Sequence, residues 1–425
     1  MSDKGNGRVF PRGVRLRRRR MLGLGIGTAM AMPTVWRRAF GGAIPYRLGT
    51  LQPLTGVAAL GGKTALIGVQ MAVDRINNSG GLLGRPIDLI PADSESNPAS
   101  GRRAVEKLVT EDNIDFHVGG YLSNVCLACG PVWIEHQVVN MIGVCLDTTL
   151  TTTHCNRYTF RPYDFAPAQA KAFAPYLVKE LGKKWYITYA DYAWGQSTRD
   201  AYAREIASNG GEVAGTTGIP LGTPDMTPFL SKINGDFDGL FYIFFGGDAI
   251  NVVNQSYDLG LARKYKRAGD GAVTVASQLP AMGKKIEDFV AIDRYVPVFD
   301  QPLDTPYLHR FFDEAVVRLK KAGIANALPD RYVQSNFEAV NALKLGVEKS
   351  NFQGRADTDK LIAALEGMHM KEGDDFPTGD KILRKEDHQA FMREIIFRME
   401  DSKYHLLTTV PWQDTVVPPA CTFSA

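Results

Sequence analysis

The segment from residue 46 to residue 93 constrains the fold of this chain most, because it combines a strand, a helix and a second strand. A short apolar run (residues 46–51) leads into a turn rich in Pro, Thr and Gly (residues 52–62), and a second apolar run covers residues 87–91. Between them, apolar residues recur at spacings of three and four, as on one face of a helix: Leu66, Val69, Ala72, Val73 and Ile76. Such a unit has parallel strands and a right-handed crossover. Ligands bind beyond the carboxyl ends of these strands, which places the loop 52–62 at a binding edge.

The sequence of this segment also resembles that of a known family. The strand ends in Pro-Leu-Thr-Gly, and the helix closes on Asp-Arg-Ile-Asn-Asn-Ser-Gly-Gly-Leu-Leu-Gly-Arg-Pro-Ile before the next strand. This succession is similar to the opening of the leucine/isoleucine/valine-type (type I) periplasmic binding proteins, which are the extracytoplasmic receptors of ABC importers. The similarity runs from about residue 46 to about residue 412. It implies an α/β fold of two Rossmann-like lobes joined by a three-segment hinge, with an ABC transporter permease as the partner.

The resemblance divides the chain into discontinuous domains. Lobe one is expected to hold residues 44–160 and 297–368, and lobe two residues 161–296 and 369–412. Residues 413–425 form a C-terminal tail. The strand–helix alternation continues through both lobes, with an expected strand at residues 273–276 in lobe two.

The first 43 residues are predicted to be a signal peptide and leader. Arg18-Arg19-Arg20-Met21-Leu22 fits a twin-arginine signal, in which two arginines, any residue and two apolar residues follow one another. The apolar run behind it is too short to span a bilayer, and Arg37-Arg38 follow it closely. We therefore predict a periplasmic protein that is exported by the twin-arginine route.

The basic character of the whole chain comes from this leader. The first 40 residues hold ten of the 49 Lys and Arg and one of the 46 Asp and Glu, which leaves a net charge of −6 for the remainder. Nothing in this charge indicates nucleic-acid binding.

We expect the protein to be a monomer and to bind no cofactor.

Four of the five cysteines lie within thirty residues of one another, at Cys126, Cys129, Cys145 and Cys155. In an exported protein they predict disulfides, and the alternatives are Cys145–Cys155, Cys126–Cys129 or a crossed pairing. A zinc site is disfavoured, because the second pair is ten residues apart instead of two to four. Cys421 is expected to be an unpaired thiol in the tail.

The candidate ligand-binding residues of lobe one follow two predicted strands. Tyr121, Ser123 and Asn124 lie between a strand and a helix start, where free backbone amides and the helix dipole favour an anion. In the resembled family the matching serine binds the ligand carboxylate, while the alternative role is plain helix capping. Cys145 and Leu146 stand where amino-acid receptors of the family place a small residue and a threonine.

The candidates of lobe two are mainly aromatic. Tyr192 and Trp194 match a motif whose third position covers the ligand side chain, and Phe245 matches an aromatic wall. Asp248 is a candidate for a ligand ammonium but is better placed as a helix cap. Gln278 falls near the position where amino-acid receptors of the family have an acidic residue.

Together these residues predict a receptor for a small carboxylate-bearing solute with an apolar or aromatic body. A branched-chain or other hydrophobic amino acid or amide is the alternative ligand, and a ligand sensor of the same fold is the alternative role. An enzyme is not expected, because the chain lacks the glycine spacing of phosphate loops and the Gly-x-Ser-x-Gly and His-Glu-x-x-His motifs.

Overall fold

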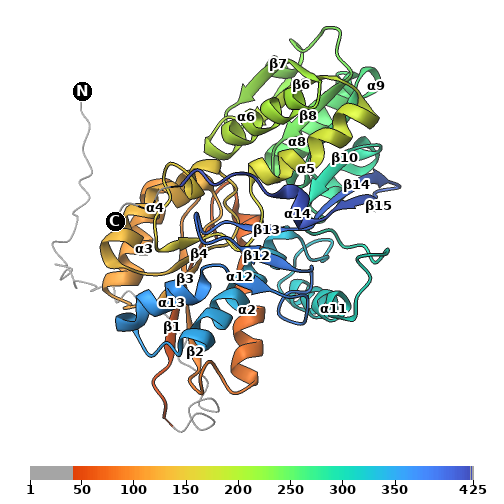
Figure 1. Ribbon diagram of the computed structural model, residues 1–425. Coiled ribbons are helices and arrows are strands. Elements are labelled where there is room, and N and C mark those ends of the chain that lie inside the picture. The colour runs from red at the N-terminus through yellow and green to blue at the C-terminus, as the bar shows by residue number, and fades with distance from the viewer. Residues whose placement is uncertain (1–41, 422, 424–425) are drawn as a thin grey trace, which may run out of the picture.

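The computed structural model describes residues 42–421 and 423, which form two α/β lobes (Figure 1). The twin-arginine motif and nearly all of the leader lie outside the described residues. Among the described helices, none combines the length and apolar character that crossing a bilayer requires.

Lobe one is built on a five-stranded parallel sheet in the order β2-β1-β3-β4-β5. Its strands are β1 (Tyr46–Gln52), β2 (Ile87–Asp93), β3 (Phe116–Gly119), β4 (Asn140–Ile142) and β5 (Thr159–Phe160). The predicted opening unit is confirmed, since β1 and β2 pair in parallel over their full lengths, from Tyr46 opposite Ile87 to Gln52 opposite Asp93.

Helices lie on both sides of this sheet (Figure 1). They are α2 (Ala59–Asn78), α3 (Pro98–Thr110), α4 (Ser123–His136), α11 (Pro306–Lys321), α12 (Arg331–Ser350) and α13 (Thr358–Leu365). Two of these six, α11 and α13, pack against other helices. Although far apart in sequence, α2 and α12 pack so closely that a Cβ on Gly68 would lie 2.2 Å from the carbonyl oxygen of Val333. Glycine at position 68 therefore permits this close helix approach.

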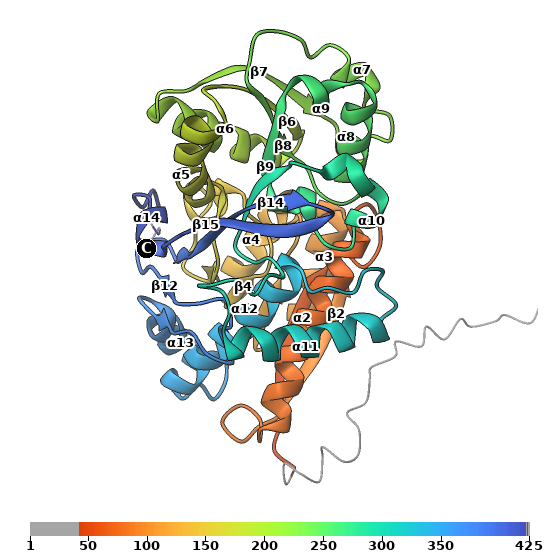
Figure 2. The ribbon, with the colours of Figure 1, turned by 90° about the vertical axis from the view of Figure 1, so that its right-hand side faces the viewer.

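Lobe two is built on a seven-stranded sheet in the order β15-β14-β10-β9-β8-β6-β7. Its strands are β6 (Lys184–Ala190), β7 (Glu212–Ile219), β8 (Gly239–Ile243), β9 (Lys266–Asp270), β10 (Val290–Asp293), β14 (Glu394–Glu400) and β15 (Lys403–Val410). Strands β6 to β10 pair in parallel, and β14 adds antiparallel to β10. In Figure 2, α5 (Ala166–Tyr176) and α6 (Ala193–Ser208) lie on one side of this sheet and α8 (Gly246–Asp258) on the other.

Short elements complete both lobes. They are η1 (Thr148–Thr151), η2 (Leu177–Leu181), α7 (Thr227–Leu230), α9 (Leu261–Lys264), η3 (Gly271–Thr274), α10 (Leu279–Met282), η4 (Gly283–Ile286), η5 (Arg355–Asp357) and α14 (Trp412–Thr415).

The expected strand at residues 273–276 is wrong. The buried strand of this region is β9, and the chain after Asp270 turns into the 3₁₀ helix η3. The side chain of Asp270 caps this turn by accepting a hydrogen bond from the backbone N–H of Ala272 at 2.8 Å. The carboxyl end of the strand therefore lies at Asp270, eight residues before Gln278.

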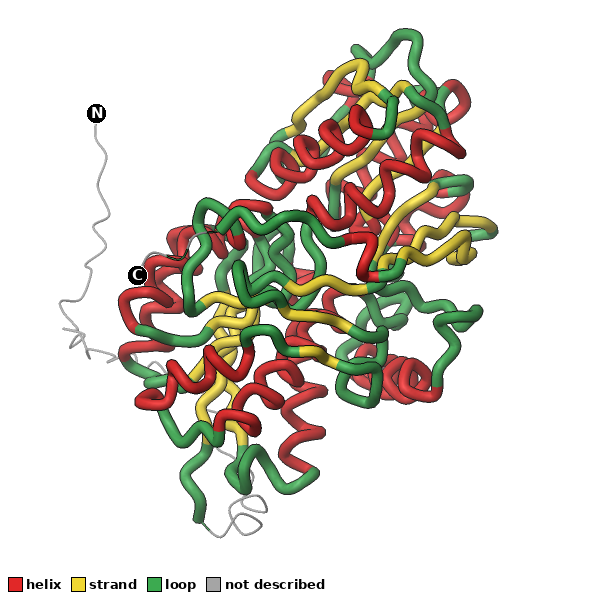
Figure 3. The backbone as a smooth tube through the Cα atoms, in the orientation of Figure 1, coloured by secondary structure: helices red, strands yellow, loops and turns green. Residues whose placement is uncertain are grey.

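Before the tail, the chain passes between the lobes three times, largely through loops (Figure 3). The passages follow β5, β10 and the small antiparallel sheet of β11 (His369–Met370), β12 (Lys381–Leu383) and β13 (Ala390–Met392). The strands of this small sheet pair only with one another among the described strands. The third passage lies between β13 and β14, whereas the domain bounds expected from the sequence change lobes between residues 368 and 369.

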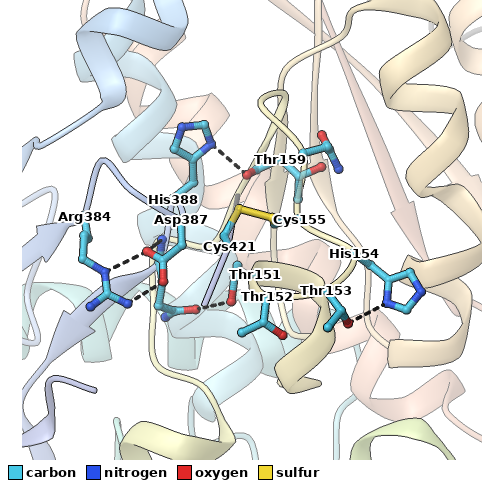
Figure 4. The surroundings of a disulfide bond; sticks show 12 residues. Thr151, Thr152, Thr153, His154, Cys155, Thr159, Arg384, Asp387, His388 and Cys421 are labelled. Atoms are coloured by element: carbon cyan, nitrogen blue, oxygen red, sulfur yellow. Dashed lines mark hydrogen bonds and ion pairs between the residues drawn. A yellow bond between two sulfur atoms is a disulfide. The ribbon is translucent and has the colours of Figure 1, made fainter. Parts of the chain in front are cut away.

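The tail returns to lobe one and ends in a disulfide (Figure 4). Cys421 bonds to Cys155, so the expectation of an unpaired tail thiol is wrong. The tail is also held by Arg384, whose Nη1 donates to the carbonyl of Val417 at 2.5 Å. Arg384 and Val417 are 33 residues apart in the sequence. Short-range sequence patterns therefore could not predict that the tail is attached here.

Candidate functional site

A narrow cavity lies between the two lobes. Ten residues line it: Tyr121, Ser123, Val144, Leu146, Tyr192, Trp194, Phe245, Ala272, Arg331 and Tyr332. The free space at its centre is small, with a volume of about 30 Å³. A larger solute therefore requires the lobes to separate and then close around it.

Parallel strands explain why residues so distant in sequence meet here. Eight of the lining residues follow the carboxyl ends of β3, β4, β6, β8 and β9. Arg331 and Tyr332 are the first two residues of α12. The carboxyl edges of both sheets therefore face the same cavity, as in other open α/β sheets.

Aromatic rings form most of the cavity wall. Tyr121 of lobe one lies 4.8 Å from Tyr332 and 5.9 Å from Phe245 of lobe two, measured between ring centroids. Phe245 lies 6.1 Å from Tyr192 and 6.0 Å from Trp194. These distances are typical of favourable aromatic contacts, so the walls suit a flat or apolar solute. Burial raises the pKa of Tyr121, Tyr192 and Tyr332, which keeps their hydroxyls neutral.

Six of the ten predicted site residues line the cavity: Tyr121, Ser123, Leu146, Tyr192, Trp194 and Phe245. The other four do not. Asn124 is half-buried behind Ser123, with its Oδ1 3.1 Å from the backbone N–H of Val125. Cys145 is buried in a disulfide.

Asp248 and Gln278 are both buried away from the cavity lining. Asp248 accepts a hydrogen bond from the backbone N–H of Gly222 at 2.8 Å and lies inside α8, whose N-cap is Phe245. The helix-capping alternative for Asp248 is therefore wrong. The helix-capping alternative for Ser123 and Asn124 is also wrong. The N-cap of α4 is Leu122, and its side chain makes no capping hydrogen bond.

Ser123 is buried, and its hydroxyl oxygen accepts a hydrogen bond from the backbone N–H of Asp147 at 3.3 Å. Its hydroxyl proton remains available as a donor. Since Ser123 is the first residue of α4, the positive end of that helix faces the cavity.

A disulfide supports this part of the site. It joins Cys126 to Cys145, so it ties the first turn of α4 to the segment that carries Val144 and Leu146. The Cys145–Cys155 pairing is wrong, because Cys155 bonds instead to Cys421 and Cys129 keeps a free, buried thiol. Four of the five cysteines are therefore in disulfides, which rules out the zinc alternative for them.

Sequence reasoning missed the one charged residue of the cavity wall, Arg331. Its side chain is buried; Nη1 lies 2.5 Å from Oδ1 of Asp270, and Nε lies 3.3 Å from Oδ1 of Asp293. Burial lowers the pKa of Arg331, but Asp270 and Asp293 raise it by more, so the guanidinium stays charged. Burial also raises the pKa of Asp293 to about 7, despite the opposing effect of Arg331.

None of the residues that line this cavity belongs to a group with the spacing of metal ligands. Among all the described residues, one group has ligand atoms close enough together to hold a metal. It consists of Glu106 on α3 and of Glu135 and His136 on α4. None of these residues lines the cavity. The arrangement at the cavity is that of a binding site, with aromatic walls and few polar groups.

Comparison with known proteins agrees with this geometry. A model of the periplasmic binding protein family matches residues 45–403. The Leu/Ile/Val-binding protein BraC3 of Rhizobium johnstonii is 25% identical over 335 residues, which cover 78% of this chain and 84% of that protein.

Solved structures show the same fold. A solute binding protein of an ABC transporter from R. palustris, in complex with benzoate, superimposes with a TM-score of 0.78 at 20% identity, covering 89% of this chain and 99% of that one. A second solute binding protein from R. palustris, in complex with 4-hydroxybenzoate, superimposes with a TM-score of 0.77 at 20% identity. This match covers 87% of this chain and 98% of that one. This is a family of extracytoplasmic solute receptors and not of enzymes. The chain therefore belongs to the periplasmic binding protein family, and its two lobes have the type I fold.

Proposed function

We propose that this protein is the solute receptor of an ABC importer and that it closes on a small carboxylate with an apolar or aromatic body. The observation that carries the proposal is the cavity between the lobes, with five aromatic rings and, among its ten lining residues, no carboxylate. Aromatic walls favour an apolar body. The start of α4 at Ser123 favours a negative charge on the solute.

Binding would proceed by hinge closure about the three passages between the lobes. The closed, liganded form would then be presented to a membrane permease. We also propose that the protein is exported by the twin-arginine route and that it does not catalyse a reaction. The complexes of related proteins with benzoate and 4-hydroxybenzoate support the ligand class.

A hydrophobic α-amino acid is the second candidate ligand. It is favoured by Asp270, which lies two residues from the cavity-lining Ala272 and whose Oδ2 has no hydrogen-bond partner among the described residues. The names of related proteins, such as the Leu/Ile/Val-binding protein BraC3, point the same way. Against it, Asp270 does not line the cavity and already pairs with Arg331.

A thermal-shift panel tests the receptor role. Benzoate, phenylpropanoate, phenylalanine and leucine are added separately, with benzylamine as a matched aromatic without a carboxylate. We expect at least one of the two carboxylic acids to raise the melting temperature by several degrees, because binding at 100 times Kd stabilises the native state by about 2.7 kcal/mol. Benzylamine should have no effect.

The same samples are then analysed by chromatography. We expect every compound to be recovered unchanged. Conversion of a compound would contradict the non-catalytic role, and a panel without any shift would contradict the proposed ligand class.

A further inference from the structure

Arg331 is the one charged residue of the cavity wall, and its surroundings define what it can bind. It is 2% exposed and begins α12 of lobe one. Its Nη1 and Nε are occupied by Asp270, at the end of β9, and Asp293, at the end of β10. Arg331 therefore already joins the two lobes by buried ion pairs.

The third nitrogen of this guanidinium is unused. Nη2 of Arg331 is buried and has no hydrogen-bond partner among the described residues. Leaving a buried charged donor unpaired costs more than leaving a neutral one, so such a group calls for an acceptor. A charge-assisted hydrogen bond from this one free nitrogen suits an anionic acceptor such as a carboxylate.

A second lining residue has the same property. Nε1 of Trp194 is also buried without a partner. Of the ten residues that line the cavity, these two alone have buried side-chain atoms without partners, and both atoms are N–H donors. A solute that satisfies them must bring hydrogen-bond acceptors, and an ammonium group brings none.

We propose that Arg331 binds the carboxylate of the solute through Nη2, with Trp194 Nε1 as an additional donor. This inference rests on the proposed function and narrows it, because it makes a negative charge the feature that selects the solute. The carboxylate becomes a third acceptor on a guanidinium that links α12 to the strands of lobe two. Binding of the solute therefore strengthens the contact between the lobes and favours closure.

The test compares an acid with its neutral amide. Benzoate and benzamide have nearly the same shape, and 4-methylpentanoate and 4-methylpentanamide form the aliphatic pair. Calorimetry measures the dissociation constants of all four for the wild type, Arg331→Gln and Arg294→Gln. Arg294 is the matched control, because it is equally buried and pairs with Asp164 at 2.7 Å but does not line the cavity.

We expect the wild type to prefer the acid strongly. Arg331→Gln should bind the acid about 100-fold more weakly and the amide within about fivefold of the wild type, since a charged hydrogen bond is lost. Arg294→Gln should keep the wild-type ratio of acid to amide affinity, whatever its stability. An unchanged ratio in Arg331→Gln would overturn the assignment of Arg331 and leave the receptor role intact.

Loss of the buried arginine leaves Asp270 and Asp293 unpaired, so the melting temperature is recorded for each variant. If Arg331→Gln does not fold, Arg331→Lys replaces it, because lysine keeps the charge but has a single nitrogen in place of the three of arginine. If the ratio of acid affinity to amide affinity falls about tenfold in Arg331→Lys, the result supports the role of Arg331 in binding the carboxylate. If this ratio stays at the wild-type value, that role is overturned. A wild-type protein that binds none of the four probes would overturn the proposed function and the assignment together.

Discussion

Trp194→Ala is expected to weaken the binding of benzoate by about 30-fold, which corresponds to about 2 kcal/mol. Trp194 is buried, lines the cavity and packs its ring 6.0 Å from those of Tyr192 and Phe245. Removing the indole takes away the largest apolar surface that the solute can contact, together with an unpartnered N–H donor. Calorimetry at constant pH and salt measures the change.

Two variants serve as controls for this result. Trp194→Phe keeps an aromatic surface and should lose much less affinity. Trp185→Phe changes another buried tryptophan of lobe two, on β6 and away from the cavity lining, and should lower stability without changing the dissociation constant. Equal affinities of Trp194→Ala and the wild type would show that the solute binds elsewhere.

Lysine at both Arg18 and Arg19 is expected to leave nearly all of the precursor in the cytoplasm. The twin-arginine signal depends on the arginine pair, so a change that keeps the positive charge should still abolish export. Cell fractionation followed by immunoblotting measures the distribution. The matched control places lysine at Arg37 and Arg38, which lie outside the motif and should be dispensable. Periplasmic accumulation of the Arg18/Arg19 variant at the wild-type level would rule out this export route.

Local sequence patterns predicted most of the fold. The apolar spacing between residues 66 and 76 predicted the helix α2, and the flanking apolar runs predicted the strands β1 and β2. The strand β9 escaped prediction because it reads Lys-Arg-Ala-Gly-Asp, with no β-branched residue, although four of its five residues are buried. Arg267 is tolerated there because its guanidinium donates to the carbonyls of Lys285 and Glu287.

This missed strand explains the main gap in the predicted site. Placing the strand end at residues 277–278 drew attention to Gln278, whereas the chain reaches the cavity at Ala272, beside Asp270. Arg331 was missed for a different reason. Its role depends on Asp270 and Asp293, which are 61 and 38 residues away in the sequence, and no local pattern reports such contacts. The disulfide between Cys155 and Cys421 is a third contact of this kind.

We predict that the protein selects a solute with a carboxylate and does not accommodate an ammonium. The cavity wall contains one guanidinium and no carboxylate, and Asp270, two residues from the cavity-lining Ala272, is paired with that guanidinium. Burying an ammonium without a charged acceptor costs several kcal/mol, which is more than the roughly 0.5–1.5 kcal/mol that an aromatic contact adds beyond area burial. An acid without the amino group should therefore bind more tightly than the matching α-amino acid.

The most direct measurement is a calorimetric titration of matched pairs, phenylpropanoate against phenylalanine and 4-methylpentanoate against leucine. We predict that, in at least one of the two pairs, the acid has a dissociation constant at least tenfold lower than that of the matching amino acid. Tighter binding of both amino acids would contradict this prediction and would show that the closed site offers an acceptor for the ammonium.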